Sequence, residues 1–89
     1  MNLLIVDDDA VMRATLREIL EREAGWRVID ADDGEAAWTL MDSGFTPDLC
    51  VFDIVMPRLD GLDLVERMRE DKRFAATKVI IVSLAAERR

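Results

Sequence analysis

The sequence is 89 residues long, so it holds one domain at most. Hydrophobic residues make up 51% of it and charged residues 35%, a balance that is typical of a folded globular domain and argues against a disordered chain. The formal net charge is −7 and basic residues form no cluster, so we expect no nucleic-acid contacts by this domain.

Four short apolar segments alternate with helical patterns along the chain. Runs of this length and composition are typical of strands that are covered on both faces of a parallel sheet. The second segment differs because Arg27 interrupts it, which favours an edge strand. The segments are LLIV (3–6), WRVI (26–29), LCVF (49–52) and VIIV (79–82).

Between the first two segments, the apolar spacing predicts an amphipathic helix. Asp9 is a suitable cap for its start, and Gly25 is a favourable residue at its end. Glu18 and Arg22 are spaced as an i,i+4 ion pair. The inward positions are Met12, Leu16, Ile19 and Leu20, and the opposite face holds Arg13, Arg17, Glu18, Glu21 and Arg22.

Two shorter helices are predicted from similar signals. One follows Asp33, a suitable N-cap, and is closed by Gly44 and Pro47. The other begins near Asp60 and Gly61. The inward residues are Ala37, Leu40 and Met41 in the first of these helices, and Leu64, Val65 and Met68 in the second.

This order of elements, β-α-β-α-β-α-β, predicts an α/β fold with right-handed crossovers and a doubly wound parallel sheet. In such sheets ligands bind beyond the carboxyl ends of the strands. Acidic residues stand at two of these ends, because Asp7, Asp8 and Asp9 follow the first strand and Asp53 ends the third. If those strands are neighbours, Asp8 and Asp53 lie side by side.

Carboxylates packed so closely repel one another unless a cation lies between them. The sequence shows no evident lysine, arginine or histidine beside them, and Mg²⁺ is the natural cation for oxygen donors of this kind. The simpler interpretation is that aspartates after a strand cap the next helix, and for Asp9 alone we prefer it.

Two residue types limit the chemistry further. Cys50, the single cysteine, lies in an apolar run, which excludes a disulfide framework and predicts a buried, inert thiol in a reducing compartment. Histidine is absent, so any phosphohistidine must belong to another protein. The apolar run at residues 3–6 is too short for a signal peptide or a membrane span, and we expect a cytoplasmic protein with no membrane contact.

The motifs LLIVDDD, DGEAAW, PDLCVFDIVMPRLDG and VIIVS, in this order and spacing, resemble the receiver domain of two-component response regulators. The resemblance covers the whole chain and implies a flavodoxin-like sheet with strand order 2-1-3-4. Receivers normally continue through a helix, a fifth strand and a last helix. Residues 1–89 are therefore interpreted as an incomplete receiver domain, from which the family's fifth-strand lysine is absent.

The resemblance also implies roles for the acidic residues. Asp53 would be the phosphoacceptor, which attacks a phosphoryl group carried by a histidine kinase or phosphotransfer protein. Mg²⁺ would be held by Asp8, Asp53 and the backbone carbonyl of Val55, with Asp7 acting mainly through water.

Four further residues acquire roles from the same resemblance. Ser83 would bond to the phosphoryl group and sense it. Met56 and Pro57 would restrain the loop after the acceptor. Gly61 would let the chain turn into the third helix.

Other functions remain open at this point. A receiver-like interaction module that no longer switches is favoured by the missing lysine and by the bulky Leu84, and a self-associating fragment is a further alternative. A Mg²⁺-dependent phosphohydrolase would need a second aspartate at the position of Val55. Finally, the segment at residues 79–82 is composed as an interior strand but would form an edge, which predicts a homo-oligomer through that open edge or by exchange of elements.

Overall fold

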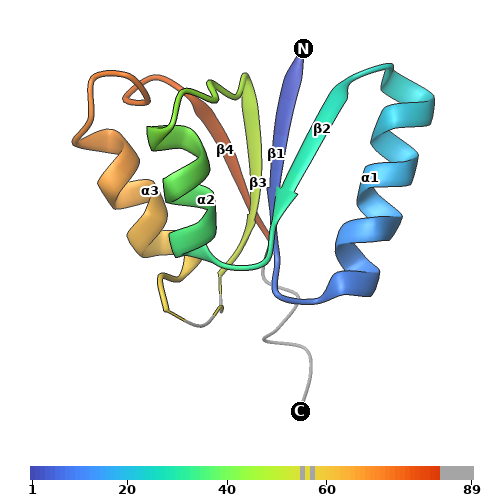
Figure 1. The fold of residues 1–89 in the computed structure, drawn as a ribbon, viewed down its shortest axis with the longest axis horizontal. Helices are drawn as coiled ribbons and strands as arrows, with labels where there is room; N and C mark the ends of the chain where they lie inside the picture. The colour runs from blue at the N-terminus through green and yellow to red at the C-terminus, as the bar shows by residue number, and fades with distance from the viewer. Residues whose placement is uncertain (55, 57, 83–89) are drawn as a thin grey trace.

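The computed structural model of the chain describes residues 1–54, 56 and 58–82. Strands and helices alternate through this part of the chain, as the sequence predicts (Figure 1). The strands are β1 (Asn2–Val6), β2 (Arg27–Ala31), β3 (Leu49–Asp53) and β4 (Lys78–Val82), and the helices are α1 (Ala10–Ala24), α2 (Gly34–Asp42) and α3 (Gly61–Arg69).

The strands form one parallel sheet in the order β2-β1-β3-β4, which confirms the predicted fold and strand order. Helix α1 lies on one side of the sheet, and α2 and α3 lie on the other (Figure 1). Strand β2 is an edge strand, as Arg27 indicates, but it begins after Trp26 and extends to Ala31. In the centre, Val6 of β1 pairs with Phe52 of β3, so these two strands end side by side.

Two apolar clusters hold the helices to the sheet. The smaller one, below α1, is built on Leu3, Ile5 and Val28. The larger one lies under α2 and α3, and β1 and β3 contribute to both because their side chains alternate between the faces. Its buried members are Leu4, Val6, Ala37, Met41, Cys50, Phe52, Met56, Leu59, Leu64, Met68 and Phe74.

Each helix begins with an aspartate cap at the same edge of the sheet. Asp9 accepts hydrogen bonds from the backbone N–H groups of Val11 and Met12, at 3.0 and 3.2 Å. Asp33 and Asp60 cap α2 and α3 in the same way. The carboxylates satisfy N–H groups that have no partner within the helix, which is why aspartate recurs at these three positions.

Helix α1 packs Leu16 and Leu20 against the smaller cluster, as predicted, but other positions differ from the prediction. Ile19 was predicted to face inward, but it is 43% exposed, and that prediction is wrong. Arg13 and Arg17 were predicted on the outer face, yet both are half-buried and contact Asp30 of β2. The reason is that strand β2 carries the carboxylate of Asp30, and both arginines form ion pairs with it.

Cys50 is fully buried in the middle of β3, as predicted. Burial raises the pKa of its thiol to about 12, and the charge of Arg69 lowers it less. The thiolate is the reactive form of cysteine, so this residue is an inert part of the core. Among the described residues, no helix combines the length and the apolar character that crossing a membrane requires.

Candidate metal centre

Three carboxylates from two neighbouring strands meet at the C-terminal edge of the sheet. Asp7 and Asp8 follow β1, and Asp53 is the last residue of β3. One oxygen of each carboxylate lies within 4.8 Å of an oxygen of the other two. The predicted convergence of Asp8 and Asp53 is therefore confirmed, and Asp7 lies in the same cluster.

The cluster is buried on one side, at Asp7 and Asp53, and open to solvent on the other, at Asp8, which we call its mouth. Asp7 is 5% exposed and Asp53 is 2% exposed, whereas Asp8 is exposed. Two carboxylates held 4.8 Å apart repel by about 3 kcal/mol at an effective dielectric constant of about 20. A divalent cation at the mouth would remove this repulsion, and three carboxylate oxygens are a donor set that Mg²⁺ prefers. The residues present therefore fit Mg²⁺.

A tight turn after β1 separates the roles of the consecutive aspartates. The side chain of Asp7 accepts a hydrogen bond from the backbone N–H of Asp9 at 2.8 Å. The side chain of Asp9 is directed at the start of α1, where it caps the helix. The prediction that Asp9 is a cap is confirmed, and only its two predecessors join the cluster.

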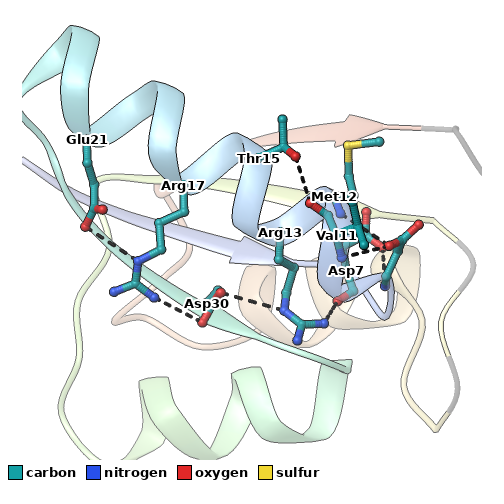
Figure 2. A network of polar contacts seen from close by, with 9 residues as sticks. Asp7, Val11, Met12, Arg13, Thr15, Arg17, Glu21 and Asp30 are labelled. Carbon is teal, nitrogen blue, oxygen red and sulfur yellow. Dashed lines mark hydrogen bonds and ion pairs between the residues drawn. The ribbon is translucent and has the colours of Figure 1, made fainter.

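Arg13 is a cation beside the cluster that sequence reasoning missed. Its Nη1 donates to the backbone carbonyl oxygen of Asp7 at 2.6 Å, and its Nε lies 3.7 Å from the carboxylate of Asp30 (Figure 2). Arg17 then links Asp30 to Glu21 (Figure 2). The signal was the spacing of Arg13 from the acidic turn, because one turn of helix carries its side chain back towards the helix start.

Two glycines near the cluster lie too close to neighbouring backbone atoms to carry a side chain. A Cβ atom at Gly61 would lie 2.2 Å from the backbone oxygen of Asp53, and one at Gly34 would lie 1.9 Å from the backbone oxygen of Leu59. Gly61 also donates its N–H to the carbonyl of Ile54 at 3.0 Å. Close approach to Asp53, rather than a left-handed turn, is thus what excludes a side chain at Gly61.

We predict that Gly61→Ala and Gly34→Ala each lower the free energy of unfolding by about 2–3 kcal/mol, because a methyl group would force the backbones apart. Urea unfolding followed by circular dichroism measures this loss. Gly25→Ala is the matched control, since that site is open and only its left-handed φ of 67° opposes a side chain, at a cost of about 1 kcal/mol. Equal losses at all three glycines would contradict the prediction.

The other residues with expected roles are placed only in part. Met56 is 7% exposed and packs in the larger core cluster, so its side chain anchors the segment after Asp53. Val55, Pro57 and Ser83 lie outside the residues that the structure describes.

Comparison of this chain with known proteins identifies its family and several relatives. The model of the family described as "Response regulator receiver domain" matches residues 3–89. The chain is 35% identical over 83 residues to chemotaxis protein CheY1 of Helicobacter pylori. This alignment covers 93% of this chain and 67% of that protein. It is 41% identical over 68 residues to transcriptional regulatory protein CpxR of Escherichia coli, covering 76% of this chain and 28% of that protein.

Solved structures give the same picture. A response regulator receiver protein from Pseudomonas putida superposes with a TM-score of 0.82 at 34% identity, over 92% of this chain and 66% of that one. The signal receiver domain of a histidine kinase from Syntrophus aciditrophicus gives a TM-score of 0.85 at 30% identity, over 91% and 60%. The present chain thus spans about two thirds of the length of the CheY1 relative and somewhat less of the second of these structures.

Proposed function

Because this chain belongs to the response regulator receiver domain family, we propose that it receives the signal of a two-component system by accepting a phosphoryl group on Asp53. The observation that carries this proposal is the convergence of Asp7, Asp8 and Asp53 within 4.8 Å at two adjacent strand ends. We propose further that residues 1–89 belong to a single domain of this kind.

The position of Asp53 suits a nucleophile. Its carboxylate ends a buried strand, so its backbone is fixed by the sheet and its side chain is 2% exposed. A carboxylate oxygen would attack the phosphorus of a phosphohistidine, the P–N bond would break, and the histidine ring would leave and take up a proton. The product is an acyl phosphate on Asp53. Phosphoryl transfer of this kind depends mainly on positioning and on charge stabilisation.

The metal would be held by Asp8 and Asp53 directly, with Asp7 behind them acting through water and the backbone carbonyl of Val55 as a further donor. When bound, Mg²⁺ neutralises the charge that develops on the transferred group. The carboxylate of Asp7 is constrained because the backbone N–H of Asp9 donates a hydrogen bond to one of its oxygens. The exposed Asp8 leaves the mouth of the site accessible to a donor protein.

The partner that supplies the phosphoryl group is a histidine kinase or a phosphotransfer protein. This chain has no histidine, so the donor side chain must come from that partner. We propose that the domain signals rather than turning over a substrate, that it acts in the cytoplasm, and that it contacts neither nucleic acid nor membrane. Within the described residues, nothing favours a phosphohydrolase or a non-switching interaction module.

Incubation with Mg²⁺ and a small acyl phosphate donor, followed by intact-mass measurement, tests the proposal. We expect the mass gain of one phosphoryl group, and we expect chelation of the metal to prevent it. A folded chain that gains no mass under these conditions would overturn the proposed function.

We also predict that the 89-residue chain self-associates. In the part of the chain that the structure describes, β4 pairs only with β3, and Ile80 in the middle of β4 is 52% exposed. An apolar strand with an open edge recruits another strand. Sedimentation velocity at protein concentrations on the order of tens of micromolar should show dimers or larger species. Ile80→Lys should reduce them, and a wild-type chain that stays monomeric would refute the prediction.

A further inference from the structure

Arg58 is the first residue of the segment 58–61, which leads into α3, and it has an unusual backbone. Its φ is 69°, and it is the only residue other than glycine with a positive φ among the residues that the structure describes. A side chain makes this left-handed conformation unfavourable, so it persists only where surrounding contacts enforce it. The contacts of Arg58 therefore show what holds this segment in place.

The side chain of Arg58 forms an ion pair with Asp33 at the start of α2. Nη2 of Arg58 contacts Oδ2 of Asp33, while Oδ1 of the same carboxylate accepts a hydrogen bond from the N–H of Ala36 at 2.8 Å. The Asp33 side chain is only 2% exposed, whereas that of Arg58 is 68% exposed. A buried carboxylate is thus partly neutralised by a cation that reaches it from the neighbouring segment.

Leu59, the next residue along the chain, also lies against the start of α2, through its backbone. Leu59 is 8% exposed, and its carbonyl oxygen lies where a Cβ atom of Gly34 would be. Two consecutive residues, Arg58 and Leu59, therefore touch two consecutive residues, Asp33 and Gly34. At its far end the same segment packs Gly61 against the carbonyl oxygen of Asp53. The segment is held at both sides, by α2 and by the strand that carries Asp53.

We propose that Arg58 is a positioning residue, whose ion pair with Asp33 holds residues 58–61 against α2 and Asp53 in the arrangement that Mg²⁺ binding and phosphoryl transfer require. The inference rests on the proposed function of Asp53. Loss of the pair frees Arg58 from its left-handed conformation, and Gly61 is then held less firmly against the carbonyl oxygen of Asp53. Weaker metal binding and slower phosphoryl uptake follow from this, without a change in the side chains of the cluster.

Two variants distinguish this positioning role from a simple effect of net charge on Mg²⁺ affinity. Arg58→Ala removes a positive charge near the acidic edge, and Asp33→Ser removes a negative charge while keeping a side-chain oxygen for the cap of α2. If only long-range charge matters, the first variant binds Mg²⁺ more tightly and the second more weakly. If the ion pair positions the segment, both variants bind Mg²⁺ more weakly.

The experiment measures the Mg²⁺ dissociation constant by calorimetry and the exchange rate of the Gly61 amide by NMR. That amide is bonded to the carbonyl of Ile54 and therefore reports closure of the segment. We expect each single variant to weaken Mg²⁺ binding about fivefold and to speed exchange about fivefold. The double variant should add nothing further, because both substitutions break the same contact. Arg58→Lys should restore part of both losses.

The matched control is Arg22→Ala, which breaks an exposed arginine pair with Glu18 on α1 and should change neither quantity. Opposite shifts in Mg²⁺ affinity for Arg58→Ala and Asp33→Ser, or no change in either variant, would overturn the inference. Should Asp33→Ser fail to fold, Arg58→Ala at an exposed position still tests the exchange rate. If the wild-type chain binds no Mg²⁺ and accepts no phosphoryl group, the proposed function fails, while the exchange of Gly61 still tests the ion pair.

Discussion

Asp53→Asn is expected to abolish phosphoryl uptake from a small acyl phosphate donor in the presence of Mg²⁺. The amide has nearly the same shape as the carboxylate, so the strand end should keep its structure. However, a neutral amide oxygen is a much poorer nucleophile, and the variant also lacks one of the charges that hold the metal. Intact-mass spectrometry of the two proteins under identical conditions measures the effect.

The control for this prediction is Asp32→Asn. Asp32 is exposed and follows β2 at the same edge of the sheet, so the substitution changes the local charge equally without touching the cluster. We expect it to accept the phosphoryl group like the wild type. Treatment with hydroxylamine should release the group, because it cleaves acyl phosphates and leaves hydroxyl esters intact. Uptake by Asp53→Asn, or a group that resists hydroxylamine, would show that another residue is the acceptor.

The second large effect concerns stability. Because Mg²⁺ binds the carboxylates only where folding brings them together, it should stabilise the folded state by about 2.7 kcal/mol at a hundred times its dissociation constant. For a domain of this size such a gain corresponds to a rise in Tm of roughly 10–20 °C. Thermal unfolding with and without Mg²⁺, at matched ionic strength, measures this shift.

The same experiment with Asp53→Asn separates metal binding from general effects of salt. Without metal, this variant should be more stable than the wild type by about 1–3 kcal/mol, since one of two buried like charges is gone. With metal, its Tm should rise much less than that of the wild type. Equal stabilisation of the two proteins by Mg²⁺ would mean that the ion binds elsewhere.

Local sequence signals were sufficient for most of the fold. The strands could be predicted because each is a short apolar run, and the helix starts because an aspartate stands before each one. The cluster could be predicted because a parallel topology carries Asp8 and Asp53 to the same edge once β1 and β3 are neighbours.

The errors arose where a distant residue decides the outcome. Ile19 was predicted to be inward from the polarity of α1 alone, but Ile19 is exposed, and Arg13 and Arg17 are half-buried and pair with Asp30 of β2. Helical periodicity contains no information about the charge of the strand beneath. A prediction that ignores the partner strand therefore fails at an edge strand that carries a carboxylate.

The contact of Arg58 with Asp33 could not be predicted for a similar reason. The two residues belong to different β-α connections, and nothing in either local sequence indicates that they meet. The need for glycine at position 34 could not be predicted either, because its lack of a side chain matters only once Leu59 lies against it. Contacts of this type depend on how two loops approach each other, which spacing along one chain segment does not encode.

The most direct test of the metal centre is a crystal structure of the chain grown with Mn²⁺ in place of Mg²⁺, because manganese gives an anomalous signal. We expect one strong anomalous peak within about 2.0–2.3 Å of carboxylate oxygens of Asp8 and Asp53, the range for a small divalent ion with oxygen ligands. A peak at another group of acidic residues, or no peak between these two side chains, would contradict the assignment of this site.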